Sequence, residues 1–152
     1  MLLLTDFRAF ADAFVNERPN LENNITVAEH DDAVNEYKDI VNAGNTCTLI
    51  TLVPSHDDDS NNEDNAKMKN NLSFYILKKT DTKASNDTKL DNFAICQLEI
   101  LALAKKIKAL ISNPEGNCMF KNIELNSIQI TPMPNYLGGN GYVMDFYTKT
   151  AF

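Results

Sequence analysis

Five acidic residues gather in one short polar segment and form the main concentration of charge in the chain. They are Asp57, Asp58, Asp59, Glu63 and Asp64, all within residues 54–71. Asp57, Asp59 and Asn61 place side-chain oxygens at alternate positions, as the opening of a calcium-binding loop does. The later positions depart from that loop, because Asn62 stands where a glycine is required and Met68 stands where a bidentate glutamate closes the site. The pattern therefore favours an acidic loop that faces solvent, a partner or a lumen over a specific cation site.

Two histidines have carboxylates as neighbours in the sequence. His30 precedes Asp31 and Asp32, and His56 precedes the acidic run. An imidazole beside a carboxylate can bind a transition metal or act in acid–base catalysis. Neither histidine has a ligand-type residue four positions away, so two surface histidines in polar loops are expected. An enzyme with a site assembled around His30 or His56 remains an alternative, and a deep pocket would be its sign.

The three cysteines are widely spaced and odd in number, which suits reduced thiols in a cytosolic setting better than a disulfide framework. Cys47 falls in an apolar strand and Cys96 in an apolar helix, so both are expected to be buried. Cys118 has no identifiable base nearby. The glycines of residues 138–141 match no phosphate-binding motif and are typical of a hairpin loop. The sequence therefore predicts no catalytic, cofactor or metal site.

Composition predicts one globular domain spanning residues 1–152. The chain is 43% hydrophobic and 23% charged, which is ordinary for a globular protein. Removing the five acidic-segment charges from the net charge of −7 leaves −2 for the rest of the chain. No basic patch is present, so specific nucleic-acid binding is not expected. No apolar run is long enough to cross a bilayer, and the apolar start is too short for a signal peptide.

The longest helical pattern runs from Leu90 to Ile111, about residues 89–111, with Thr88 or Asp87 as the expected N-cap and Pro114 in the stop signal. A helical wheel places one apolar stripe toward the core. Its members are Leu90, Phe93, Ala94, Leu98, Ile100, Leu101, Ala104 and Ile111. Apolar residues outside the stripe predict that the flank around Ile95, Ala102 and Leu103 is covered by another element or another subunit.

A second amphipathic helix is expected from Leu4 to Asn16, with Thr5 as a possible cap and three phenylalanines on its core face. They are Phe7, Phe10 and Phe14. Residues 21–45 are expected to contain a short strand, Asn24 to Val27, and a helix, Glu29 to Val41.

Four further segments have strand patterns. Thr46 to Val53 and Leu72 to Lys79 are nearly continuously apolar, and a long polar loop joins them, which predicts an antiparallel pair. Phe120 to Ile130 changes phase near Asn126-Ser127, where a break is expected. Pro132, Pro134 and the following glycines predict a loop before a last strand, Tyr142 to Thr150, which should pair with the preceding strand as a hairpin. The elements together predict an α+β fold, with a largely antiparallel sheet of four or more strands and the two helices packed on it.

This order of elements resembles the small tail-terminator and head–tail joining proteins of tailed bacteriophages. The closing segment, ITPMPNYLGGNGYVMDFYTKT, is similar to the ends of prophage tail proteins in Bacteroides-type genomes, where a Pro-containing loop and a Gly-aromatic pair precede a final strand. Gly141-Tyr142 and Asp145-Phe146-Tyr147 carry the resemblance. Family members often have Trp after this glycine, where this chain has Tyr142.

The resemblance implies a non-enzymatic structural protein that forms a ring, commonly hexameric, in the virion or the host cytoplasm. Such a ring caps the tail tube and contacts other tail or connector proteins. The acidic segment would then line the lumen, where negative charge lets DNA slide. Deleting Asp57 to Asp64 would leave assembly intact under this hypothesis. The alternative is a small cytosolic protein-binding adaptor module that presents its acidic face to a basic partner.

Overall fold

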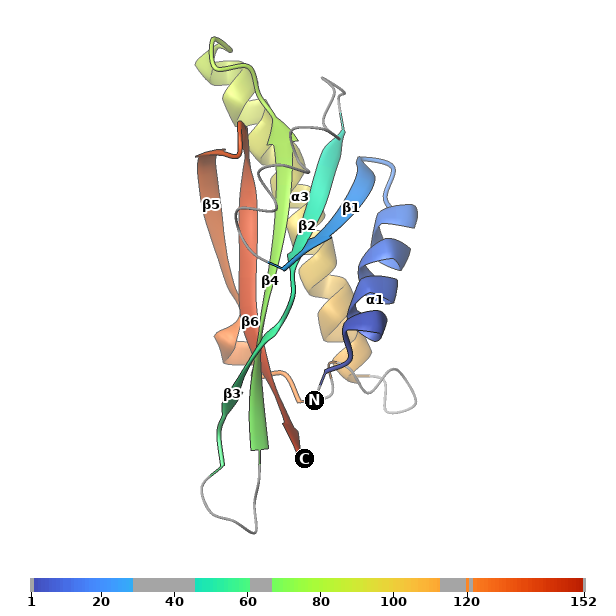
Figure 1. Ribbon diagram of the computed structural model, residues 1–152. Coiled ribbons are helices and arrows are strands. Elements are labelled where there is room, and N and C mark those ends of the chain that lie inside the picture. The colour runs from blue at the N-terminus through green and yellow to red at the C-terminus, as the bar shows by residue number, and fades with distance from the viewer. Residues whose placement is uncertain (1, 29–45, 61–66, 113–119, 121, 152) are drawn as a thin grey trace.

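The computed structural model describes residues 2–28, 46–60, 67–112, 120 and 122–151. Within these residues two α-helices pack on a mostly antiparallel sheet, which confirms the expected α+β class (Figure 1). The helices are α1 (Leu4–Asn16) and α3 (Asn86–Ser112), with a short 3-10 helix, η2 (Leu125–Ser127). The strands are β1 (Leu21–Val27), β2 (Cys47–Leu52), β3 (Ser55–Asp58), β4 (Lys67–Lys79), β5 (Gln129–Tyr136) and β6 (Gly139–Ala151).

The sheet has the strand order β1-β2-β4-β6-β5, and β3 pairs with β4 outside this path. The expected antiparallel pair of β2 and β4 and the expected closing hairpin of β5 and β6 are both confirmed. β1 pairs with β2 in parallel and is longer than expected, since it begins at Leu21. The helix expected over Glu29 to Val41 lies outside the described residues.

Helix α1 has the expected bounds, because its apolar residues recur every three or four positions on one face. Phe7, Phe10 and Phe14 are all buried. The expected cap at Thr5 is wrong: the N-cap position is Leu3, which offers no side-chain hydrogen bond. Burial of the phenylalanine face therefore stabilises the start of this helix without a capping side chain.

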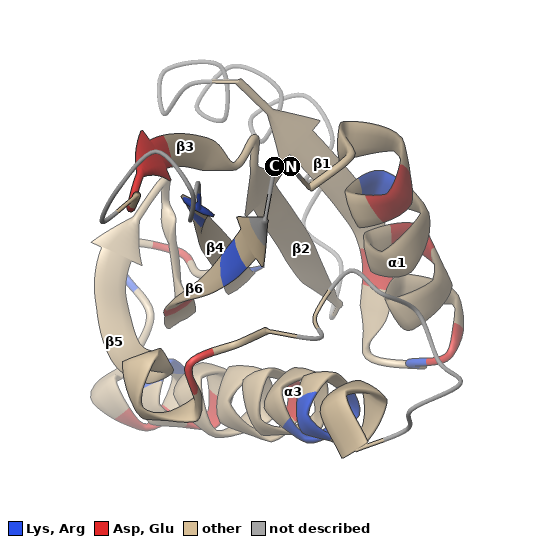
Figure 2. Cartoon of the chain, turned by 90° about the horizontal axis from the view of Figure 1, so that it is seen from below, with Lys and Arg blue, Asp and Glu red and all other residues tan. Residues whose placement is uncertain are grey.

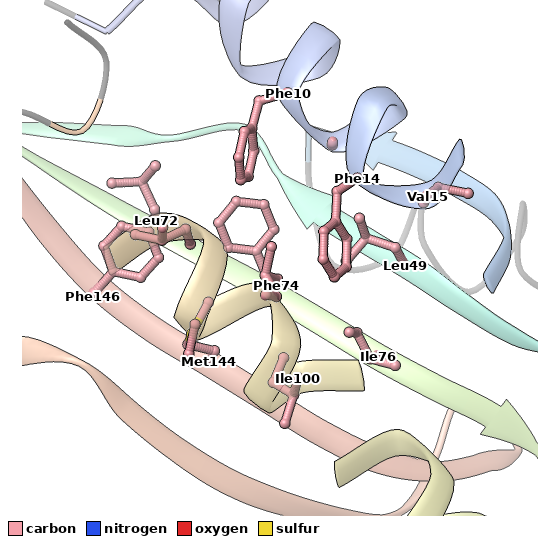
Figure 3. Close-up of a cluster of buried hydrophobic side chains, with 14 of the residues drawn as sticks. Phe10, Phe14, Val15, Leu49, Leu72, Phe74, Ile76, Ile100, Met144 and Phe146 are labelled. Carbon is pink, nitrogen blue, oxygen red and sulfur yellow. The ribbon is translucent and has the colours of Figure 1, made fainter. Parts of the chain in front are cut away.

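Phe74 of β4 lies at the centre of the core between α1 and the sheet (Figure 3). Its ring centroid is 5.1 Å from that of Phe7 and 5.9 Å from that of Phe146. Phe10 packs edge-on to Phe120 with a centroid distance of 4.8 Å. These tilted and offset arrangements are the favourable ones for aromatic rings, so the cluster fixes α1 on the sheet.

Helix α3 begins earlier than expected, at Asn86. The cap is Ser85, whose Oγ accepts a hydrogen bond of 3.2 Å from the backbone N–H of Thr88. The expected caps, Thr88 and Asp87, are therefore wrong, since both residues lie inside the helix. Of the described helices, none is both long and apolar enough to cross a membrane.

The expected core-facing stripe of α3 is largely wrong. Leu90, Leu98 and Leu101 are 56%, 64% and 42% exposed. The buried face instead comprises Asn92, Cys96, Glu99, Ile100, Leu103, Ala104 and Ile107. Three of these side chains are polar or weakly polar, and their partners come from segments remote in sequence, so a hydrophobic pattern could not assign them to the core.

The flank of α3 around Ile95, Ala102 and Leu103 is covered, as expected. Leu103 is fully buried, and Ile95 and Ala102 pack against the main core. The cover belongs to this same chain, so this flank supplies no argument for association with another subunit.

Strands β4 and β6 remain paired over their whole length, from Lys67 opposite Ala151 to Lys79 opposite Gly139. β3 pairs with the first residues of β4. We call β3, residues 67–71 and residues 147–151 the arm, because they extend beyond the ends of both helices (Figure 1). The polar loop expected over residues 54–71 is therefore partly strand.

The expected strand from Phe120 to Ile130 is wrong in its first part. A 3-10 turn occupies Leu125–Ser127, which confirms the break near Asn126-Ser127, and β5 starts only at Gln129. β5 then continues through Pro132 and Pro134, where a loop was expected. The prolines are tolerated because β5 is the edge strand and needs no hydrogen-bond donors on its outer side.

Two glycines meet different steric demands in the closing hairpin. Gly138 lies in the turn with φ of 77°, a conformation that favours glycine. Gly141 lies in β6, where an added Cβ would be 1.9 Å from the carbonyl oxygen of Ile76. Part of the expected glycine loop is thus strand, and Gly141 allows close approach of β4 and β6.

Candidate functional site

The carboxylates of the acidic segment bind separate partners. An oxygen of Asp57 accepts a hydrogen bond of 2.7 Å from Asn71 Nδ2, and Asp59 lies 2.9 Å from Lys149 Nζ. No group of three or more His, Cys, Asp or Glu side chains in the described residues is placed to hold a metal ion. Asn61, Glu63 and Asp64 lie outside those residues. The described carboxylates therefore hold the arm together and do not form a common centre.

Charge and hydrogen bonding fix the tip of the arm. Hydrogen bonds from Ser60, through its side chain and its backbone N–H, lower the pKa of Asp58. The hydrogen bond with Asp59, together with the charge of Glu124, raises the pKa of Lys149. Both shifts favour the charged forms, so the tip keeps its ionic contacts near neutral pH.

His56 lies on β3 and faces an amide. Its Nδ1 is 2.7 Å from Asn70 Oδ1. Nδ2 of the buried Asn70 donates to the carbonyl oxygen and Oγ1 of Thr148 and to Oγ1 of Thr150. Because Oδ1 is the accepting atom of the amide, Nδ1 of His56 is assigned as the donor. The histidine thus links β3 to β4, and His30 lies outside the described residues.

Cys47 and Cys96 are both fully buried, as expected, and they are neighbours in space. Their Sγ atoms are 3.6 Å apart, and Cys96 Sγ is 3.5 Å from the carbonyl oxygen of Asn140, to which it donates. The hydrogen bond with Cys47 and burial raise the pKa of Cys96. Both sulfur atoms are buried away from external reagents, so this pair contributes to packing. Cys118 lies outside the described residues.

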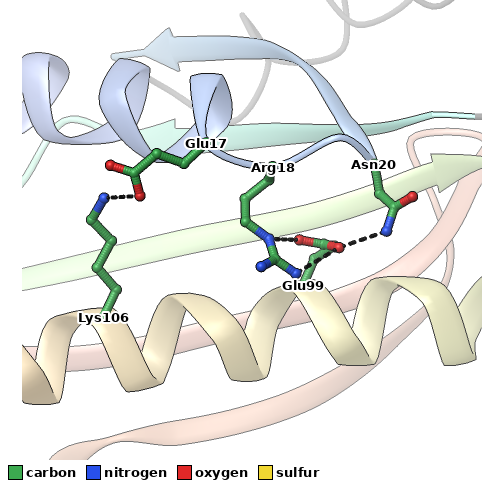
Figure 4. Close-up of polar contacts among 5 residues, drawn as sticks. All are labelled: Glu17, Arg18, Asn20, Glu99 and Lys106. Atoms are coloured by element: carbon green, nitrogen blue, oxygen red, sulfur yellow. Dashed lines mark hydrogen bonds and ion pairs between the residues drawn. The ribbon is translucent and has the colours of Figure 1, made fainter.

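Glu99 of α3 is a buried carboxylate with partners from the turn between α1 and β1 (Figure 4). Arg18 donates to both carboxylate oxygens of this fully buried residue, at 2.6 and 3.1 Å, and Asn20 donates at 2.8 Å. Burial raises the pKa of Glu99, but the hydrogen bonds from Arg18 and Asn20 and the charge of Arg18 outweigh it, so the pKa is lowered. Both carboxylate oxygens of Glu99 have hydrogen-bond donors within the chain, so these contacts attach the turn between α1 and β1 to α3.

An apolar surface lies on the side of α3 that faces β5. Beside the exposed Leu101, a groove of about 370 Å³ separates α3 from β5 and η2. Its apolar lining includes Ala104, Leu125, Ile128 and Ile130, and Lys105 and Lys108 also line it. We call this groove, together with the exposed Leu90, Leu98 and Leu101, the α3–β5 face. Hydrophobic periodicity indicated these leucines but assigned them to the core.

The opposite edge of the sheet carries acidic side chains. Asp6 and Asp12 of α1 and Glu22 of β1 are exposed. A polar hollow of about 370 Å³ lies between α1 and β1 and includes Asp12 and Glu22 in its lining. We call this surface the α1–β1 face. Figures 1 and 2 place α1 and β5 on opposite sides of the molecule, consistent with β1 and β5 being the two ends of the strand order.

The described residues thus present two surfaces of contrasting character, one largely apolar with lysines beside it and one acidic. Comparison of the sequence with protein-family models gives no match. Comparison with curated proteins gives no significant match either.

Proposed function

We propose that this chain is a non-enzymatic structural subunit that assembles into a ring in a phage or prophage tail, as a tail terminator or head–tail joining protein. The observation that carries the proposal is the α3–β5 face, where large apolar side chains remain exposed beside an edge strand. Such surfaces in folded proteins mark sites of association. The order of elements supports the phage assignment by resemblance.

The size of the apolar surface indicates what kind of interface it can form. Full burial of a leucine contributes roughly 1.5–3 kcal/mol, so four half-exposed leucines contribute about 3–6 kcal/mol. Leu90, Leu98, Leu101 and Leu125 are the four. Association costs about 4–15 kcal/mol in lost rigid-body freedom, so the leucines alone do not hold two copies together. The groove and complementary charges must supply the remainder, which favours one defined partner over nonspecific clustering.

The edge strand β5 restricts how copies meet. Pro132 and Pro134 have no backbone N–H, so β5 cannot support an uninterrupted ladder with a strand of another copy. Side-chain packing against the groove is the contact that this edge permits. A side-chain contact allows the angle between neighbouring copies that a closed ring needs.

The arm supplies a feature that extends away from the two-helix body. Asp57 and Asp58 are exposed on β3. In the proposed ring these carboxylates face a central channel, where they repel the phosphates of passing DNA. Deleting residues 57–64 would remove half of β3, so assembly is no longer expected to survive that deletion.

Charge reversal tests the arm without removing its strand. In the Asp57→Lys/Asp58→Lys variant we expect an assembled ring that retains duplex DNA in a gel-shift experiment at low salt. The wild-type ring should not retain the same DNA under the same conditions. Equal retention by both proteins would contradict the channel role, whereas the ring itself is tested separately.

Light scattering coupled to size-exclusion chromatography, followed by electron microscopy, tests the proposed function. We expect the purified full chain to form a discrete ring of identical copies, with an open centre, as its concentration rises. A monomer at every concentration would overturn the proposal. Recovery of such a monomer with one basic partner protein would instead support the adaptor alternative.

A further inference from the structure

We propose that the contact within the ring is head to tail: the α3–β5 face of one copy receives the α1–β1 face of the next copy. This inference rests on the proposed function, because it names the occupant of the apolar face. The occupant is a second copy of this chain, because the two faces lie at opposite ends of the strand order and carry opposite charge.

The positions of the faces favour a head-to-tail contact. β1 and β5 are the two ends of the strand order, with α1 packed on β1 and α3 on β6, the neighbour of β5. In Figure 2, α1 and β5 lie on opposite sides of the molecule, with β2, β4 and β6 between them, and α3 runs along a third side. A contact between two different surfaces of a subunit repeats from copy to copy. It gives a ring when the rotation between neighbouring copies closes, and the proposed ring requires such a rotation.

The charges of the two faces are complementary. Lys105 and Lys108 of the α3–β5 face and Asp12 and Glu22 of the α1–β1 face are all exposed. Asp12 accepts a hydrogen bond from Asn24, and Glu22 accepts one from Thr46, so each carboxylate has a neutral donor. None of these four charged side chains forms an ion pair with another described residue.

The nearest competing charges do not cancel this difference. Arg8 is the one cation of α1 and lies one turn before Asp12, but Asp6 and Glu22 keep the net charge of the α1–β1 face negative. On α3, Glu99 precedes Lys105 by six positions but is buried and paired with Arg18. The next carboxylate, Asp91, precedes Lys105 by fourteen positions, or roughly 20 Å along the axis. That distance exceeds the screening length at physiological ionic strength, about 8 Å, so the lysines dominate their end of the helix.

A symmetric contact of the α3–β5 face with itself is disfavoured by the same charges. Such a contact would bring four lysines of the two copies, and no carboxylate of the α3–β5 face, into one interface, where like charges that come close are repulsive. The α1–β1 face instead offers opposite charge, from Asp12 and Glu22. The exposed Leu3 and Leu4 lie at the other end of α1, about two turns before Asp12.

Charge reversal on each face tests the pairing. The Lys105→Glu/Lys108→Glu variant and the Asp12→Lys/Glu22→Lys variant should each weaken assembly about tenfold or more, because attraction becomes repulsion. Combining all four substitutions in one chain should restore assembly, since both faces then reverse together. An equimolar mixture of the two double variants should also assemble, with the two kinds of copy alternating.

Light scattering and native mass spectrometry provide the readout, and thermal unfolding followed by circular dichroism verifies that each variant is folded. Lys83→Glu, an exposed substitution before α3, is the matched control and should assemble like the wild type. Two results would overturn the head-to-tail contact but not the proposal of a ring. One is that both double variants assemble as well as the wild type, and the other is that the chain with all four substitutions remains dissociated. A monomeric wild type would overturn the ring itself.

Discussion

Replacing Arg18 with Met should strongly destabilise the fold, because the buried carboxylate of Glu99 then keeps only Asn20 as a hydrogen-bond donor from the chain. The methionine keeps the apolar stem of the side chain and removes the guanidinium. Asn20 still donates to one oxygen, but the oxygen 2.6 Å from Arg18 Nε loses its partner. The perturbation therefore isolates the cost of an uncompensated buried charge.

The expected magnitude follows from burial. Breaking a buried ion pair by removing one partner costs about 3–5 kcal/mol. The Arg18 side chain is 34% exposed, so water can partly replace its hydrogen bonds, and we expect a loss of about 2–3 kcal/mol. The matched control is Lys106→Met, which removes the ion pair with Glu17. That carboxylate is 60% exposed, so the control should cost no more than about 1 kcal/mol from the ion pair.

The pH dependence of urea unfolding gives a second readout. The pKa of Glu99 is lowered in the folded protein, so its contribution to stability is present above the unfolded pKa, about 4.3, and is lost as the pH falls through the folded pKa. In the Arg18→Met variant the hydrogen bonds and charge of Arg18 no longer offset the effect of burial, so the pKa of Glu99 in the folded protein should rise above the ordinary glutamate value. The stability difference between wild type and variant should therefore shrink as the pH is lowered from 7 to 4.

Two results would refute this reasoning. One is a loss for Arg18→Met no larger than that for Lys106→Met, and the other is a loss that does not change with pH. A second variant separates charge from packing: Arg18→Met combined with Glu99→Leu removes both charges and should recover most of the lost stability. Urea unfolding followed by circular dichroism measures all three variants.

Three further predictions concern steric fit, thiol access and helix capping. Gly141→Ala should destabilise the fold by several kcal/mol or prevent folding, because the added Cβ would overlap the Ile76 carbonyl. Gly138→Ala should cost only about 1–2 kcal/mol, because its Cβ would lie in open space and only the positive φ is unfavourable. Similar urea midpoints for the two variants would contradict this difference. Neither Cys47 nor Cys96 should react with iodoacetamide in the folded protein, and both should react in urea; mass spectrometry of the native protein that showed rapid labelling of either would disprove their burial. Ser85→Ala should cost about 1 kcal/mol by removing the N-cap of α3, and an unchanged unfolding midpoint would show that the cap does not contribute.

Elements whose apolar residues are the residues that are buried could be predicted from the sequence. Helix α1 has one apolar face and the whole of that face is buried, so its bounds and its phenylalanines were predicted correctly. β2 was predictable for a related reason. Its continuous apolar run suits a strand with neighbours on both sides and cover on both faces.

Helix α3 illustrates where hydrophobic periodicity is insufficient. Its leucines occur around much of the helix, so the pattern alone does not determine which side faces the sheet. The observed orientation buries Glu99 with Arg18, a residue 81 positions away, and Cys96 with Cys47, 49 positions away. Such long-range polar partners cannot be read from spacing within one helix.

The surfaces proposed for assembly could be predicted only in part. Apolar excess on α3 indicated an association surface, but the flank chosen from the sequence, around Leu103, is the one that this chain covers itself. The α3–β5 face depends on β5, and its prolines were interpreted as a loop because the sequence does not show which strand lies at the edge. The complementarity between Lys105 and Asp12 likewise requires the strand order.

A cryo-electron microscopy map of the assembled chain is the most direct test of the central claim. The account predicts a closed ring in which α1 of each copy packs against the α3–β5 face of the next, with the arms directed at a central channel. A map of a two-fold dimer joined through Leu98 and Leu101 of both copies would contradict the account, as would a protein that remains monomeric at every concentration.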